Sequence, residues 1–181
     1  MNRMYRRLVI LILAGLIGGA SANNYQQTGL IEGTLNGEEH TWYTFRSSDP
    51  AVVPTANWFD IMGMFTSVSI QGHSELRYSL ENAFTIELTL FDELEACPCT
   101  LTDAMITWWH QTELYPHYHA ENGTVNVEES ELIGDGAYRL IGTYEATLVL
   151  QESMFADPDP NDTVEAAGRF IIDWLPEDPL D

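Results

Sequence analysis

Three histidines and a glutamate form the most suggestive metal-ligand pattern in the chain. If residues 105–110 form a strand, the shortest return pairs His110 with His117, and His119 then shares their face of the sheet. Glu128 is expected on the same face, from the next strand. Three imidazoles and a carboxylate resemble a zinc or copper(II) ligand set. The alternative, which we favour, is that these histidines lie on a solvated face of the sheet without acting as metal ligands.

A second cation candidate is the acidic segment 157–162, whose sequence is Asp-Pro-Asp-Pro-Asn-Asp. Oxygen-bearing side chains at alternate positions are typical of calcium-binding loops. The glycine expected at the sixth position is replaced by Asp162, and the glutamate expected at the twelfth by Gly168. We therefore favour a flexible acidic loop between two core strands over a calcium site.

Cys97 and Cys99 are the only cysteines, and they flank Pro98. Three interpretations stay open, which we rank as a strained local disulfide, a soft-metal dithiolate and a redox pair. An oxidising compartment favours the disulfide. The spacing lacks the two intervening residues of the common zinc and thioredoxin motifs.

The sequence contains no recognisable catalytic motif. It has no Gly-x-Ser-x-Gly nucleophile elbow, no glycine-rich phosphate loop after a strand and no His-Glu-x-x-His helix. Carboxylate pairs for glycoside cleavage cannot be selected among 28 acidic residues. The aromatic residues Trp58, Trp108 and Tyr115 could instead stack on sugar rings, which makes carbohydrate binding a rival to metal binding.

The elements that would position these residues are predicted by turn dipeptides. Asn122-Gly123 and Asp135-Gly136 both suit the two-residue type I′ turn, in which both central residues have positive φ. The first turn would place Tyr118 opposite Val127, and the second would place Val127 opposite Tyr144. Both turns put apolar residues on one face, which predicts a three-stranded meander with one buried face.

Apolar and polar residues also alternate in the rest of the chain, as is typical of strands. Asn36-Gly37 predicts another hairpin near the start, and residues 105–110 are assigned to a strand rather than a short helix. About eight to nine short strands, each with one polar face, predict an all-β antiparallel sandwich. A lipocalin-like barrel is the alternative, although the usual Gly-x-Trp signature is missing. Further strands are expected at 28–35, 39–45, 64–71, 76–80, 84–90, 138–150 and 166–174.

The first 22 residues have the pattern of a secretory signal peptide. Arg3, Arg6 and Arg7 precede an apolar run, and small residues follow up to Ala22. The apolar run is shorter than a membrane span requires, so we expect cleavage rather than anchoring. This predicts a periplasmic or secreted protein with a single domain at residues 23–181.

The chain beyond residue 22 is strongly acidic. It carries all 28 acidic residues, four arginines and no lysine, which gives a net charge of −24. Such a surface repels nucleic acid and anionic lipid, so we expect neither as a partner. The acidity is interpreted as a solvated surface rather than as a cation-binding device.

Four segments carry a resemblance to known proteins: residues 31–39 (IEGTLNGEE), 122–127 (NGTVNV), 141–146 (IGTYEA) and 167–173 (AGRFIID). Together they resemble a loose group of secreted bacterial β-sandwich proteins of unknown function. The resemblance implies an exported sandwich and supplies no catalytic residue. Members of the group are often lipoproteins, whereas this chain lacks a lipid-attachment cysteine near the cleavage site.

The sequence thus predicts an exported acidic β-sandwich that acts as a binding or structural module rather than as an enzyme. A metal protein that uses the histidine cluster with zinc or copper, and a carbohydrate-binding module, are the two alternatives. A cation, a glycan or another protein is the expected partner, and no cofactor is assigned.

Overall fold

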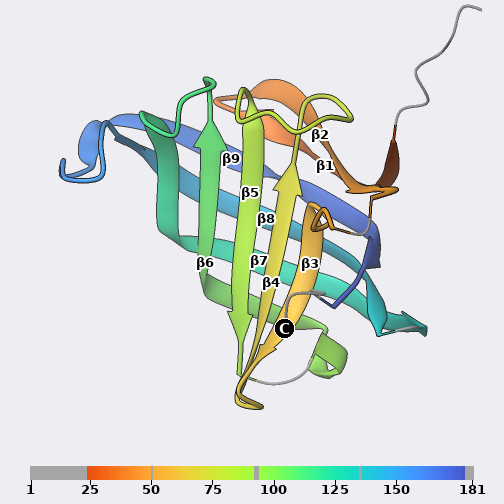
Figure 1. Cartoon of the computed structure of the whole chain (residues 1–181). Coiled ribbons are helices and arrows are strands. Elements are labelled where there is room, and N and C mark those ends of the chain that lie inside the picture. The colour runs from red at the N-terminus through yellow and green to blue at the C-terminus, as the bar shows by residue number, and fades with distance from the viewer. Residues whose placement is uncertain (1–23, 50, 92–93, 135, 178–181) are drawn as a thin grey trace, which may run out of the picture.

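Nine strands and one short 3₁₀ helix make up the described part of the chain. The computed structural model describes residues 24–49, 51–91, 94–134 and 136–177 (Figure 1). The predicted signal peptide lies outside these residues and stays a prediction. The described residues contain no helix long and apolar enough to cross a membrane. The elements are β1 (Tyr25–Leu35), β2 (Glu38–Ser47), β3 (Ala56–Ile61), β4 (Phe65–Gly72), β5 (Ala83–Leu90), η1 (Leu94–Ala96), β6 (Cys99–Trp109), β7 (His117–Gly134), β8 (Ala137–Gln151) and β9 (Asp159–Leu175).

All nine strands belong to one antiparallel sheet with the order β2-β1-β9-β8-β7-β6-β5-β4-β3. The sheet curls strongly, so that β3 to β6 pass in front of β7, β8 and β9 in Figure 1. The predicted all-β antiparallel class with about nine strands is confirmed. The predicted division into two separate sheets is not confirmed, because the strands are paired in one continuous order.

The core lies inside the curl and is built by alternation along the strands. On β5, Ile86, Leu88 and Leu90 are buried, whereas the intervening Glu87 and Thr89 are exposed. The same alternation, predicted for residues 138–150, is found on β8. Because alternate residues of a strand point to opposite faces, one apolar series per strand is sufficient to fill the interior. The largest fully buried side chains are Trp42, Phe45, Phe84, Phe170, Ile31, Ile70, Ile86, Leu88, Leu94, Ile106, Leu140 and Leu148.

The two edges of the curled sheet come into contact. Tyr43 on β2 exchanges two backbone hydrogen bonds with His73, just past β4, at 2.8 and 3.0 Å. The backbone N–H of Phe45 donates to Thr55 Oγ1 at 2.8 Å. At the other edge, the backbone N–H of Trp58 on β3 donates to the carbonyl of Pro176 at 2.9 Å. These contacts satisfy part of the backbone that an open sheet would leave unpaired.

The Asn36-Gly37 hairpin is confirmed. Asn36 has φ +51° and Gly37 φ +83°, and they connect β1 to β2, which pair from Leu35 and Glu38 onward. The hairpin between β7 and β8 also lies where the sequence predicted it, with Gly136 at φ +71°. Asp135 itself lies outside the described residues.

The predicted hairpin at Asn122-Gly123 is wrong. Strand β7 runs from His117 to Gly134 without a turn, and Gly123 pairs with Ala104 of β6. The dipeptide coincides instead with register irregularities on both sides of β7. The physical reason is that β6 and β8 are long enough to pair with β7 before and after this point, so the strand continues.

Three smaller expectations also change. Tyr144 lies opposite Val125 rather than Val127, a shift of two residues that leaves both valines on the buried face. Residues 76–80 form no strand. Residues 56–61, which include Trp58, form β3, although no strand was predicted there.

Candidate functional site

The predicted histidine cluster is divided between the two faces of the sheet. The rings of His117 and His119 lie 5.6 Å apart, measured between centroids, and His117 also contacts Trp109. The ring of His110 instead contacts Trp108 at 5.7 Å and Tyr118 at 5.4 Å. His110 is therefore separated from the other two histidines by the sheet itself.

A one-residue difference in register causes this separation. The sequence predicted Trp108 opposite His119, whereas the structure pairs Trp108 with Tyr118 and Thr107 with His119. A slip of one residue moves every side chain of a strand to the opposite face. The register on which the predicted metal site depends is therefore wrong.

Glu128 is also distant from the histidines. It lies on the same strand as His117, eleven residues further on, so roughly 35 Å of extended chain separates them. Among the described residues, no three His, Cys, Asp or Glu side chains are arranged to hold a metal ion. Binding of zinc or copper by the protein stays a prediction. Burial and the neighbouring His117 lower the pKa of His119, an effect that Glu121 partly opposes.

The other predicted sites are local features of the fold. A disulfide joins Cys97 and Cys99 just before and at the start of β6. In the acidic segment 157–162, the backbone N–H of Asn161 donates to Asp159 Oδ1 at 2.9 Å. Calcium binding by this segment stays a prediction.

The three aromatic residues predicted to stack on a ligand lie in different places. Trp58 packs edge-on against Tyr138 at 5.7 Å, and its indole N–H donates to the carbonyl of Gly136 at 2.9 Å. Tyr115 contacts His117 at 4.8 Å. Tyr115 thereby joins a row of rings with His117, Trp109 and His119, whereas Trp108 belongs to a group in which the rings are also hydrogen-bonded to polar side chains.

We call this group the end cluster, because it lies where β6 ends, at the top of Figure 1. Trp108 stacks on Tyr118 with centroids 5.5 Å apart and ring planes 23° apart. The half-buried His40 ring of β2 lies 6.4 Å from Trp108 and stacks on the buried Trp42. The members of the end cluster are His40, Asn82, Trp108, His110, Tyr118 and Asp162.

Two hydrogen bonds fix the stacked rings of the end cluster. The indole N–H of Trp108 donates to Asn82 Oδ1 at 3.0 Å. The hydroxyl of Tyr118 donates to Asp162 Oδ1 at 3.0 Å. Burial, reinforced by the bond to Asp162 and its negative charge, raises the pKa of Tyr118, so the phenol keeps its proton for this bond. The two bonds join Asn82, just before β5, to Trp108 on β6, and Tyr118 on β7 to Asp162 on β9.

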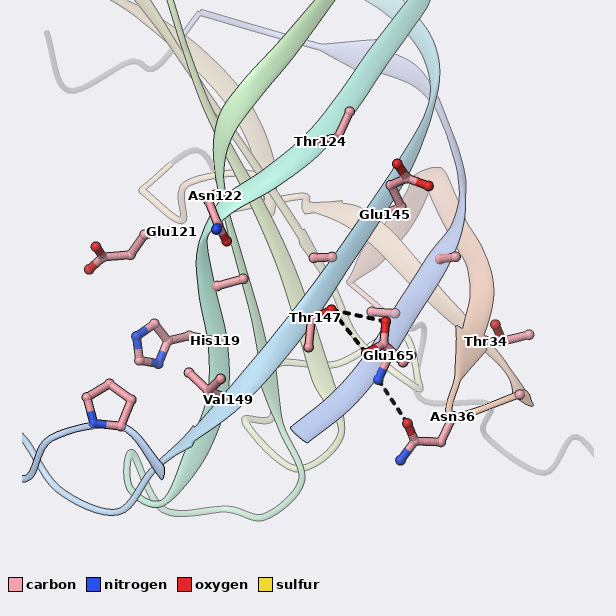
Figure 2. A pocket seen from close by; sticks show the side chains of 16 residues that line it. Thr34, Asn36, His119, Glu121, Asn122, Thr124, Glu145, Thr147, Val149 and Glu165 are labelled. Atoms are coloured by element: carbon pink, nitrogen blue, oxygen red, sulfur yellow. Dashed lines mark hydrogen bonds between the residues drawn. The ribbon is translucent and has the colours of Figure 1, made fainter. Parts of the chain in front are cut away.

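A hollow of about 1440 Å³ is lined by parts of β7, β8 and β9 and by the turn between β1 and β2. Figure 2 shows His119 and Glu121 on one side, and Thr147, Glu165 and Asn36 on the other. Thr147 Oγ1 donates to the Glu165 carboxylate at 3.0 and 3.1 Å, and Glu165 N donates to Asn36 Oδ1 at 2.8 Å. No lysine, arginine, tryptophan, tyrosine or phenylalanine lines the hollow. Its threonine, asparagine and glutamate side chains supply donors and acceptors, but it lacks the stacked tryptophan and tyrosine of the end cluster, which we therefore regard as the candidate site.

Comparison with known proteins gives no match: no family model, no curated protein and no solved structure is significantly similar to the chain. Nothing in these comparisons tests the resemblance to secreted bacterial β-sandwich proteins.

Sequence reasoning missed three members of the end cluster. His40, Asn82 and Asp162 come from distant parts of the chain: Asn82 reaches Trp108 through the pairing of β5 with β6, and His40 on β2 reaches it across the curl of the sheet. One local signal existed, since Asn82 has φ +55°, a conformation that asparagine adopts more readily than most residues. Asp162 was noticed only as part of the acidic segment.

Proposed function

We propose that the protein is an exported, non-enzymatic module that binds carbohydrate at the end cluster. The observation that carries the proposal is the partly exposed Trp108–Tyr118 stack, surrounded by polar groups. Binding sites for small molecules usually combine aromatic surface with a few placed polar groups. A sugar ring has an apolar C–H face for the aromatic surface and hydroxyls for the polar groups.

The polar groups of the cluster keep unused hydrogen-bonding capacity. Asn82 accepts from Trp108 through its oxygen, which leaves the two N–H bonds of its amide. Asp162 accepts from Tyr118 through one carboxylate oxygen, which leaves the other. Together they supply both donors and acceptors for hydroxyl groups, as a carbohydrate site requires.

The remaining parts of the proposal rest on the sequence and on the shape of the sheet. The signal-like segment supports export to the periplasm or the medium. The absence of a catalytic motif from the sequence supports a binding role. The contacts between β2 and β4 support a barrel-like architecture over the two-sheet sandwich.

The test is a glycan array followed by calorimetry with the best-bound neutral oligosaccharide. We expect Trp108→Ala to weaken binding at least tenfold, which corresponds to about 1.4 kcal/mol. Trp109→Ala is the matched control, because the neighbouring tryptophan contacts His117 on the opposite face of β6. Thermal unfolding of both variants checks that they fold.

Absence of any neutral glycan ligand would exclude this function. Equal losses in the Trp108→Ala and Trp109→Ala variants would exclude the end cluster as its site.

A further inference from the structure

We infer that Asp162 and Asn82 make the end cluster selective for neutral sugars over anionic ones, an inference that rests on the proposed function. The two residues contact the ring stack from distant parts of the chain, Asn82 just before β5 and Asp162 among the first residues of β9. Asp162 carries a negative charge. The Asn82 side chain is neutral and supplies hydrogen-bond donors and one acceptor.

The charge of Asp162 is held close to any ligand that packs on the rings. Its carboxylate is bonded to the Tyr118 hydroxyl, so it cannot swing away without breaking that bond. The carboxylate is exposed, and a ligand that bears a carboxylate or a sulfate would meet a like charge there. A neutral sugar hydroxyl, by contrast, can donate to the free carboxylate oxygen.

No arginine is placed to offset this charge. The arginines of the described chain make their contacts on other parts of the sheet. Arg46 lies over the ring of Trp174, Arg77 pairs with Glu75, Arg139 bonds Glu129 and Asp173, and Arg169 lies on β9 opposite Glu32 of β1. The chain contains no lysine.

Asn82 supplies the complementary part of the selectivity. Its backbone has φ +55°, which aspartate tolerates as asparagine does. Asn82→Asp therefore keeps the fold and the acceptor for Trp108, while it removes the amide donors and adds a second charge. Asp162→Asn keeps an acceptor for Tyr118 and removes the existing charge. The two substitutions change the charge of the same site in opposite directions.

The experiment compares a neutral hexose oligomer selected from the array with the same oligomer oxidised to the uronic acid at C6. Affinities are measured by calorimetry at pH 8 and at low salt. We expect the wild-type protein to prefer the neutral form about tenfold. Asp162→Asn should reduce this preference to about threefold or less, and Asn82→Asp should increase it. Asp103→Asn, an equal change of charge at an exposed residue elsewhere on β6, should leave it unchanged.

Each outcome decides the inference. An unchanged preference in Asp162→Asn, or an equal reduction in Asp103→Asn, would overturn the selectivity and leave the proposed function intact. Equal affinity of the wild-type protein for the neutral and the oxidised oligomer would also overturn the selectivity and leave the proposed function intact. Failure of the wild-type protein to bind any neutral oligomer would overturn both.

Discussion

Two Asn-Gly pairs in this chain have the same residues and different structures. Asn36-Gly37 forms the tight turn between β1 and β2, with both residues at positive φ. Asn122-Gly123 lies inside the eighteen-residue strand β7. The difference lies in the surroundings of the glycine. A Cβ on Gly37 would meet no atom within 4 Å, whereas a Cβ on Gly123 would lie 2.7 Å from Ile106 Cδ1.

The comparison shows that one dipeptide can meet two physical needs. At Gly37 the missing side chain permits a left-handed backbone. At Gly123 it makes room for a buried isoleucine of the neighbouring strand, and the backbone is not left-handed. A turn signal read from sequence alone cannot separate these cases, because the second depends on a residue in another strand.

The largest effect is expected from substitution of Gly123. Gly123→Ala forces a shift of the fully buried Ile106 or of the Ala104 carbonyl, which is 3.0 Å from the new Cβ. Overpacking of this kind lowers the free energy of unfolding by about 1–3 kcal/mol. Gly123→Asn should cost more than Gly123→Ala, because it adds a polar amide to the same contact. Urea unfolding followed by tryptophan fluorescence measures the free energy of unfolding of both variants. A smaller loss in Gly123→Asn than in Gly123→Ala would indicate a turn at this position.

A smaller effect with the opposite order is expected at Gly37. Gly37→Ala meets no steric contact and is penalised only by its φ of +83°, which costs about 1 kcal/mol. Gly37→Asn should cost less than Gly37→Ala, because asparagine visits the left-handed region more readily. Urea unfolding measures both losses in the free energy of unfolding. Equal losses in Gly37→Ala and Gly37→Asn would argue against the turn at Asn36-Gly37.

The smallest effect is expected at Asn122. This side chain is exposed within a continuous strand, so Asn122→Ala should change the free energy of unfolding by less than about 0.5 kcal/mol. Asn36→Ala is the matched comparison, because it removes the acceptor for the Glu165 backbone N–H at 2.8 Å and should cost about 1 kcal/mol. Equal effects at the two asparagines would contradict the structural difference between them.

Much of the fold could be predicted because its signals are local. The alternation of Phe84, Ile86 and Leu88 identifies β5, and the same rhythm identifies β8. The curl of the sheet could not be predicted, because it depends on contacts such as Tyr43 with His73, which lie thirty residues apart. Such pairings leave no local pattern in the sequence.

The candidate site was less predictable than the fold. Trp108 was identified from its residue type, but the register that places it beside Tyr118 differs by one residue from the shortest return of the chain. That single residue decides whether Trp108 and His110 share a face with His117 and His119 or with Tyr118. The meeting of Asn82 with Asp162 around the rings requires the whole sheet order, from β5 to β9.

The most direct test of carbohydrate binding at the end cluster is an NMR titration of the five tryptophan indole N–H signals. The tryptophans are Trp42, Trp58, Trp108, Trp109 and Trp174, of which only Trp108 belongs to the end cluster. Addition of the best-bound neutral oligosaccharide should shift the Trp108 signal most strongly and leave Trp109, on the opposite face of β6, nearly unchanged. A shift centred on Trp109, or no shift at saturating ligand, would contradict the account.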